Sequence, residues 1–306
     1  MILFIYSQNP EKEKFCLKIN FIYATMMKGK EGRYKMRTIA FYNQKGGVGK
    51  TTSATVISRI LAEKGKRVLI VDLDPQSNTS VLLGSVKTTD YIESLFLDVP
   101  AQGVADLSLE DVLLDTEGKV DVRSVIQHTR YPGLDLIPTF LTLSIAEGRL
   151  KDDVLSPQQF RLKNHFAAIQ DEYDICVLDC SPSISIVNIN GMAIADKVYV
   201  PMTPDAYAIA GAATVRKMLK TVSAYNPGLQ LGGLFFTKWN GRKRVSQGTQ
   251  GLIDRYLPSF LLPFNVPMCH YLEESTFSQD VTLPKSERAA IIYRQFAEYI
   301  VKSLEA

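Results

Sequence analysis

The amino-acid sequence predicts a doubly wound α/β fold, in which helices flank both faces of a mostly parallel sheet. Short, continuously apolar runs such as "RVLIVDLD" (67–74) have the composition of strands buried in a parallel sheet. Stretches of helical periodicity separate these runs, as right-handed β–α–β crossovers require. The 306 residues, of which 46% are hydrophobic and 22% charged, can bury the core that such a domain needs.

Strands and helices are expected to alternate from residue 38 onward. The expected strands are 38–42, 67–74, 134–138, 174–179, 197–202 and 231–237. The expected helices are 50–64, 158–170, 206–224 and 286–304. Residues 36–306 are therefore predicted to form a single domain. Within it, the less regular, acidic stretch 85–130 is predicted to be a surface insertion of short helices.

Residues 1–35 do not fit this pattern. Their opening apolar run stops at Ser7, whereas a membrane span needs about 20 apolar residues, and a secretory signal would place its basic region first. Met36 opens the first expected strand and would be a natural first residue. We therefore expect 1–35 to be a dispensable or disordered extension that arises from an upstream start codon. The alternative is a basic arm that touches DNA or a membrane, because the segment carries a net charge of +4.

The cysteines and the overall charge exclude several classes of site. Cys16, Cys176, Cys180 and Cys269 form no C-x-x-C pair, so the sequence predicts neither a zinc knuckle nor a disulfide framework, and it fits a reducing cytoplasm. The three histidines have no evident partners in the sequence, so a histidine-based catalytic site gains no support. Beyond residues 1–35 the net charge is −1, so affinity for nucleic acid must come from local basic patches.

A glycine-rich loop lies between the first expected strand and helix, in "FYNQKGGVGKTT" (41–52). Its glycines let the backbone approach a phosphate chain and point N–H groups at it, and the helix that follows adds the positive end of its dipole. Lys50 would reach the β- and γ-phosphates, and the Thr51 hydroxyl would bind Mg²⁺. The loop departs from the P-loop pattern G-x-x-x-x-G-K-[ST] because Gln44 replaces the first glycine and a second lysine, Lys45, precedes Lys50.

Carboxylates end two of the expected strands. Asp179 follows four apolar residues in "YDICVLD", the form of a Walker B aspartate that holds Mg²⁺ through water. Asp72 and Asp74 close the strand "VLIVDLD". Buried carboxylates are costly without a cation or donors nearby, and ligands bind such a sheet beyond the carboxyl ends of its strands. We therefore expect all three at the phosphate site, with helix capping as the alternative for one member of the pair.

These motifs together resemble the ParA/MinD family of deviant Walker A ATPases, and most closely its ParA (Soj-type) partition branch. The resemblance rests on "KGGVGKTT", "VLIVDLDPQSNTS" and "YDICVLDCSPS", which occur in the family's order. It runs from about Met36 to the C-terminus but does not obviously include 85–130. Ser181 stands where the family usually has a second proline. The resemblance implies a P-loop NTPase fold, with ATP and Mg²⁺ as cofactors.

The resemblance also implies roles for the site residues. Lys45 matches a signature lysine that reaches across an ATP-bound sandwich dimer to the neighbouring subunit's phosphates, and it would act in catalysis with Lys50. Asp74 matches the residue that positions the attacking water. Asp72 and Asp179 would complete the metal site with Thr51. The nucleotide would be bound by Lys45, Gly46, Gly47, Val48, Gly49, Lys50, Thr51 and Thr52.

The implied function is ATP-dependent partition of DNA in the cytoplasm. Mg-ATP would drive formation of a homodimer that binds double-stranded DNA without sequence preference and so associates with the nucleoid. A ParB-like centromere-binding protein would stimulate a weak intrinsic ATP hydrolysis and release the dimer from DNA. The cargo, whether plasmid, chromosome or protein cluster, is left open by the sequence.

Non-specific attachment to DNA phosphates needs exposed basic side chains. "TVRKMLK" places Arg216 and Lys220 four residues apart, on one helical face, and "TVR" resembles a family position implicated in DNA binding. The alternatives are a solvated helix face and, for the second basic run, a position near the adenine. The candidate DNA-binding residues are Arg216, Lys217, Lys220, Arg242, Lys243 and Arg244.

Two other functions compete with this prediction. A MinD-like membrane-associated positioning ATPase would end in a basic amphipathic helix. The charges of "SERAAIIYRQFAEYIVKSLEA" (286–306) balance instead, so we expect this helix to pack on the sheet and no stable membrane association. A non-catalytic nucleotide-dependent scaffold is the second competitor, and the presence of Asp74 and Asp179 argues against it.

Overall fold

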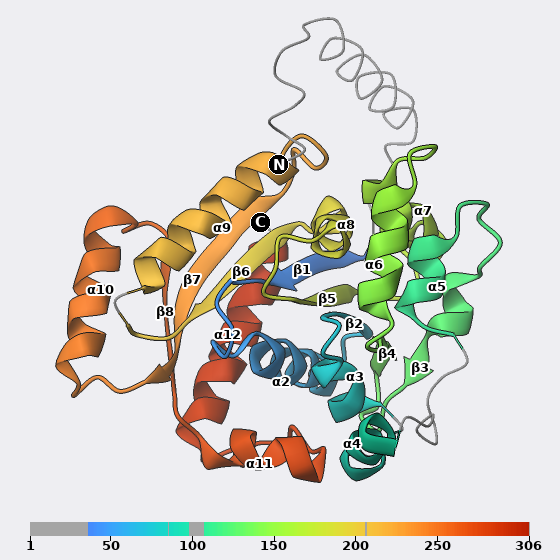
Figure 1. The fold of residues 1–306 in the computed structure, drawn as a ribbon. Coiled ribbons are helices and arrows are strands. Elements are labelled where there is room, and N and C mark those ends of the chain that lie inside the picture. Colours follow the sequence, from blue (N-terminus) through green and yellow to red (C-terminus); the bar gives the residue numbers. More distant parts are fainter. Residues whose placement is uncertain (1–35, 85, 98–106, 206, 306) are drawn as a thin grey trace, which may run out of the picture. The chain divides into compact units, whose positions relative to one another are not determined.

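The computed structural model describes residues 36–84, 86–97, 107–205 and 207–305, and the predicted extension 1–35 lies outside these residues. The strands of the described part are β1 (Arg37–Phe41), β2 (Val68–Leu73), β3 (Gln127–His128), β4 (Leu134–Ile137), β5 (Ile175–Cys180), β6 (Lys197–Met202), β7 (Gln230–Trp239) and β8 (Leu261–Pro267). They form an eight-stranded sheet in the order β3-β4-β2-β5-β1-β6-β7-β8 (Figure 1). The β3–β4 pair is antiparallel and the other neighbouring pairs are parallel. The predicted fold class is confirmed.

Helices connect the strands nearly as expected. They are α2 (Lys50–Glu63), α3 (Asn78–Leu83), α4 (Thr88–Leu97), α5 (Leu109–Leu114), α6 (Leu143–Asp152), α7 (Arg161–Phe166), α8 (Ile186–Ile194), α9 (Ala208–Val222), α10 (Arg244–Tyr256), α11 (His270–Ser278) and α12 (Arg288–Glu305). The expected helices 50–64, 206–224 and 286–304 are α2, α9 and α12. The expected helix 158–170 is shorter: a 3₁₀ turn at Gln158–Phe160 leads into α7, and the chain already turns at 167–172 on its way to β5.

The six expected strands are all present, but the two outer strands β3 and β8 were not expected. β3 has two residues, too few to give a pattern in the sequence. β8 contains Pro263 and Pro267, and proline residues in a sequence argue against a strand. An outermost strand tolerates proline because one row of its backbone groups needs no partner in the sheet.

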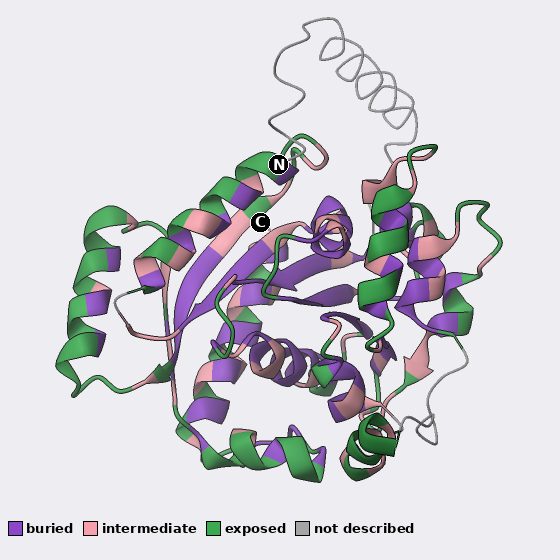
Figure 2. Ribbon diagram, in the orientation of Figure 1, coloured by how far each residue is buried: buried purple, intermediate pink, exposed green. Residues whose placement is uncertain are grey.

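Two hydrophobic clusters cover the two faces of the sheet. Because successive side chains of a strand point to opposite faces, Ile39 and Phe41 of β1 join the cluster formed with α2 and α12, whereas Ala40 joins the cluster on the other face, formed with α8 and α9. The central strands are accordingly coloured as buried between the helices in Figure 2. This three-layer arrangement is what the continuous apolar runs predict.

The stretch 85–130 is less peripheral than expected. Leu109, Val112 and Leu113 of α5 are fully buried in the core, and β3 pairs with β4 in the sheet. Only α4 fits the expectation of a surface helix, since none of its residues is buried. The prediction of a surface insertion is therefore wrong for α5, because Leu109, Val112 and Leu113 lie on one helical face that packs into the core.

The aromatic core beneath α12 provides a test of how that helix packs. Phe296 is fully buried, and its ring centroid lies 4.8 Å from that of Phe235 and 4.7 Å from that of Phe264. Replacing Phe296 with alanine should lower the free energy of unfolding by about 3–5 kcal/mol, since it leaves a large cavity. Urea denaturation measures this. Ile291→Ala, on the exposed side of the same helix, should change stability by no more than about 0.5 kcal/mol; an equal effect of both substitutions would contradict the packing.

The parallel strands bring the predicted site residues to one edge of the sheet. β1, between β5 and β6, runs into the glycine-rich loop, and β2 lies beyond β5. In the strand register Asp179 is level with both Asp72 on β2 and Phe41 on β1. The carboxylates and the glycine-rich loop therefore share the carboxyl-terminal edge, as predicted.

Candidate active site

The glycine-rich loop takes a conformation that its glycines make possible. Gly47 and Gly49 have φ angles of 70° and 84°, which side chains other than glycine rarely adopt. Gly49 is also the N-cap of α2, and a Cβ at this position would lie 3.4 Å from Thr237 Cγ2. The loop therefore leads directly into the N-terminus of α2, an arrangement suited to binding phosphate.

Two polar side chains outside the expected set brace this loop. Asn43 Nδ2 donates to the carbonyl of Pro201 at 2.8 Å, and Asn43 Oδ1 accepts from the backbone N–H of Lys45 at 3.0 Å. Thr237 Oγ1 donates to the carbonyl of Val48 at 2.8 Å. Asn43 and Thr237 thus tie the loop to β6 and β7. Sequence reasoning missed both, because their partners are brought together only by the sheet.

Lys50 lies at the base of the loop. It is buried, and its Nζ donates to the carbonyl of Lys45 at 3.2 Å. Burial lowers the pKa of Lys50, although the nearby carboxylates of Asp179 and Asp74 act in the opposite direction. A lysine held in this way points its charge into the loop, where a phosphate chain would meet it.

Lys45, the second lysine, has a different environment. Its side chain is 42% exposed, and its Nζ donates to Thr203 Oγ1 at 3.3 Å and to the carboxylate of Asp205. Thr203 Oγ1 in turn donates to Asp205 Oδ2 at 2.6 Å. Partial burial would raise the pKa of Asp205, but the hydrogen bonds from Lys45 and Thr203 outweigh it and hold the pKa below its usual value. Lys45 is therefore held by the loop after β6 and not by the glycine-rich loop itself.

Asp72 is fully buried and its oxygens are engaged by protein donors. Oδ2 accepts from the Ser80 backbone N–H at 2.8 Å and from the Ser80 hydroxyl at 2.7 Å, and Oδ1 accepts from the backbone N–H of Asp74 at 3.1 Å. Burial, followed by the charge of Asp179, raises the pKa of Asp72. In this arrangement Asp72 shapes the turn that carries Asp74, which differs from the predicted role in the metal site.

Asp179 is better suited to a metal. Its Oδ2 accepts from the hydroxyl of Thr79 at 2.7 Å, whereas Oδ1 is buried and has no hydrogen-bond partner among the described residues. Burial raises the pKa of Asp179 to about 6, with the hydroxyl groups of Thr79 and Thr51 acting in the opposite direction. A buried, unpaired carboxylate oxygen beside the Thr51 hydroxyl fits a hydrated Mg²⁺.

No cluster of three or more metal-ligating side chains occurs among the described residues. Protein sites bind Mg²⁺ through one or two side chains together with water and substrate phosphates. Of the three predicted metal ligands, Thr51 and Asp179 remain candidates for such a site, whereas both oxygens of Asp72 accept from protein donors.

The basic candidates for DNA binding form two exposed groups. Arg216, Lys217 and Lys220 lie on α9, and Arg242 to Arg244 lie between β7 and the first residue of α10. Within the described part of the chain, none of the six forms an ion pair. All six are exposed, so they are surface groups that a large anion can reach.

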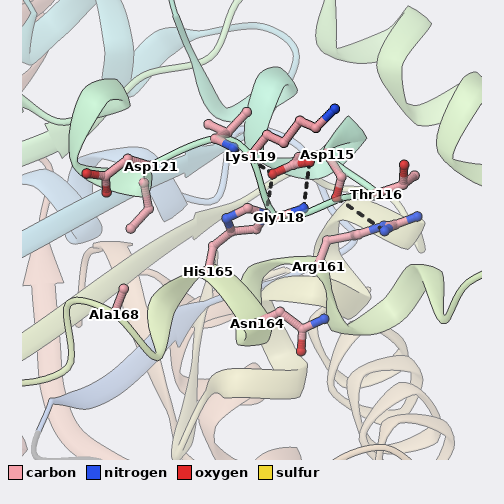
Figure 3. A pocket seen from close by; sticks show the side chains of 11 residues that line it. Asp115, Thr116, Gly118, Lys119, Asp121, Arg161, Asn164, His165 and Ala168 are labelled. Atoms are coloured by element: carbon pink, nitrogen blue, oxygen red, sulfur yellow. Dashed lines mark hydrogen bonds and ion pairs between the residues drawn. The ribbon is translucent and has the colours of Figure 1, made fainter.

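The cavity drawn in Figure 3 lies away from this site. It has a volume of about 370 Å³ and is lined by the 115–122 segment and α7. Its Asp115 carboxylate accepts from the backbone N–H groups of Gly118 and Val120 and lies 3.5 Å from His165 Nε2. These contacts give the buried side chains of Asp115 and His165 a structural role, which is to hold the segment 115–122 in place. A second cavity, of about 410 Å³, adjoins the site through Thr51 and Thr52.

Comparisons with known proteins identify relatives over most of the chain. The family model described as an AAA domain matches residues 36–231. The chromosome-partitioning ATPase Soj of Treponema pallidum (strain Nichols) is 33% identical over 237 residues, which cover 76% of this chain and 85% of that protein. The sporulation initiation inhibitor protein Soj of Bacillus subtilis (strain 168) is 34% identical over 268 residues, covering 86% and 98%.

A solved structure shows the same fold. Cobyrinic acid a,c-diamide synthase from Mycobacterium smegmatis, with a bound ATP analog and magnesium, superposes with a TM-score of 0.70 at 26% identity. The match covers 89% of this chain and 96% of the other.

Proposed function

The chain belongs to the ParA/MinD family of deviant Walker A ATPases, and from that membership we propose that it is a DNA-partition ATPase. Mg-ATP joins two copies into a dimer, the dimer attaches to double-stranded DNA without sequence preference, and hydrolysis releases it. A ParB-like activator stimulates hydrolysis, which is slow without it. The resulting location is the nucleoid.

The observation that carries this proposal is the environment of Lys45. Lys50 alone supplies the lysine that a P-loop needs for its own nucleotide. Lys45 is half-exposed, and its described partners lie in the loop after β6. Release from Asp205 would free a cation at the open edge of the sheet, where a second copy's phosphates would attract it. Dimerisation then depends on the nucleotide that supplies those phosphates.

Exposed apolar side chains on the same edge support a contact with a second copy. Ile184, in the loop after β5, is 59% exposed, and Tyr207, in the loop after β6, is 74% exposed. Large side chains of this kind are typical of the centre of protein interfaces. They lie in loops that leave the carboxyl ends of the strands, as Lys45 does.

For hydrolysis, the residues of this chain divide into binding and positioning groups. Lys50 and the backbone of the glycine-rich loop bind the phosphates, and Asp74 orients the attacking water. Thr51 and Asp179 would hold Mg²⁺, which when bound neutralises charge between the β- and γ-phosphates. Phosphoryl transfer depends mostly on such positioning and on charge stabilisation, so turnover is slow until a partner completes the site.

The packing of α12 argues against the competing membrane function. The apolar residues of this helix, including Phe296, Ile300 and Leu304, are buried in the core against the sheet. A helix whose apolar face is already buried has none to insert into a lipid interface. Within the described part of the chain, no helix is both long and apolar enough to cross a membrane.

The basic group on α9 is proposed as the DNA contact. Replacing Arg216 and Lys220 together with alanine should weaken binding to random-sequence duplex DNA. The slope of log affinity against log salt should fall by up to about 4, since the dimer would lose four phosphate contacts and each contributes about 0.9. Fluorescence anisotropy at several salt concentrations measures both. The matched variant replaces Arg242 and Arg244. A loss of DNA affinity in that second variant alone would contradict the contact on α9 and would place the DNA contact at the start of α10.

A further inference from the structure

A chain of hydrogen bonds runs from α5 to the turn that carries Asp74. It begins at the buried carboxylate of Glu110, passes through the segment between β4 and α6, and reaches Asp72 through Ser80. Its members come from four separate parts of the chain. No residue of the glycine-rich loop takes part in the contacts that form it.

Glu110 holds the segment between β4 and α6. It is buried, and its Oε1 accepts from the backbone N–H of Phe140 at 3.0 Å and from the hydroxyl of Thr142 at 2.8 Å. Its Oε2 accepts from the hydroxyl of Ser108 at 2.7 Å. A buried carboxylate with three donors is strongly held, so the segment 139–142 is fixed to the N-terminus of α5.

Ser80 transmits this constraint to the strand end. Its hydroxyl accepts from the backbone N–H of Thr139 at 2.9 Å and donates to Asp72 Oδ2 at 2.7 Å. Asp72 Oδ1 then accepts from the backbone N–H of Asp74 at 3.1 Å. The Ser80 hydroxyl therefore uses both its donor and an acceptor position. Substitution by alanine would remove both hydrogen bonds and leave only the Ser80 backbone N–H on Asp72 Oδ2, at 2.8 Å.

We propose that Ser80 and Glu110 are positioning residues for ATP hydrolysis, which act through Asp72 on the backbone that aims the Asp74 carboxylate. The inference rests on the proposed role of Asp74 in orienting the attacking water. Asp72 is the last link because it contacts both Ser80 and the Asp74 backbone. Its register neighbour Asp179 is also a buried carboxylate, so an Asp72 that lost the Ser80 hydroxyl would be held less firmly at its present position.

This arrangement predicts which kinetic constant changes. The phosphates are bound by Lys50 and by loop N–H groups, which are braced independently by Asn43 and Thr237. Weakening the hydrogen-bond chain should therefore leave nucleotide affinity intact and disturb the orientation of the water. Misplacement of a reacting group by about 1 Å can cost about 100-fold in rate.

The test compares variants of the full-length protein in steady-state ATP hydrolysis, with binding of a fluorescent ATP analog measured in parallel. Ser80→Ala and Glu110→Ala should each lower kcat by about 10- to 100-fold, with KM and analog affinity changed by less than about threefold. Ser80→Thr keeps the hydroxyl and should restore most of kcat. Glu117→Ala is the matched control, because Glu117 is an exposed acid of the same region whose side chain pairs with Lys119.

The outcomes separate this inference from the proposed function. An unchanged kcat in Ser80→Ala, or equal losses in kcat and analog affinity, would overturn the positioning role while leaving ATP hydrolysis in place. A wild-type protein without ATP turnover would overturn the proposed function itself. If Ser80→Ala does not fold, Ser80→Cys replaces it, since a thiol keeps the volume but forms weaker hydrogen bonds, and it should show the same effect on kcat to a smaller degree.

Discussion

Replacing Asp74 with alanine should lower the rate of ATP hydrolysis by about 100-fold or more, the usual contribution of a group that handles the proton or orientation of an attacking water. Asp74 is nearly buried at the end of β2, and its Oδ1 accepts from the backbone N–H of Gln76 at 3.0 Å. Steady-state turnover at saturating ATP measures the effect. Affinity for ATP should stay within about threefold, because Lys50 and the loop backbone bind the phosphates.

Two comparison variants sharpen this result. Asp74→Asn keeps the size of the side chain and its hydrogen bond to Gln76 but removes the charge, so it should lose nearly as much activity. Asp254→Ala, at an exposed position of α10, should turn over ATP like the wild type. Unchanged turnover in Asp74→Ala would show that Asp74 does not act in hydrolysis. It would also contradict the positioning role inferred for the hydrogen-bond chain through Ser80.

Replacing Lys45 with glutamine should abolish ATP-dependent dimerisation while leaving some ATP binding to the monomer. A charged side chain that pairs with phosphate inside an interface typically accounts for about 2–5 kcal/mol of association, so the dimer should weaken by about 30-fold or more. Sedimentation velocity with ATP measures the dimer. The measurement is made in an Asp74→Ala background, so that the nucleotide is not consumed.

Asp205 offers a second variant on the same contact. Lys45 pairs with Asp205, and Asp205→Asn removes the charge that holds it. Since both side chains are substantially exposed, this pair contributes less than about 1 kcal/mol, and dimerisation should need at most about fivefold less ATP. A Lys45→Gln protein that dimerises like the wild type, or an Asp205→Asn protein that fails to dimerise, would contradict the proposed release of Lys45.

The central strands and the glycine-rich loop were predictable because local patterns specify them. β2 and β5 are continuously apolar and end in carboxylates, and their parallel alignment places Asp72 level with Asp179. The edge strand β8 was not predictable, since its prolines obscure the strand pattern. The core role of α5 was also missed, because its short apolar stripe lies within an acidic stretch.

The supporting contacts of the site were beyond the reach of local patterns. Asp205 lies 160 residues from Lys45 in the sequence, and Thr79 lies 100 residues from Asp179. No sequence motif links residues that lie so far apart, so these partners can be identified only in the folded sheet. The same holds for Asp72: its position at the strand end was expected, but its engagement with Ser80 depends on how α3 folds back over the strand end.

The central claim is that ATP controls attachment to DNA through Lys45. The most direct measurement is binding to random-sequence duplex DNA at one low salt concentration, with ATP, ADP or no nucleotide, for the wild type and Lys45→Gln in parallel. The account predicts binding by the wild type with ATP only, and none by the variant. Binding that is the same in all three conditions, or absent from all of them, would contradict it.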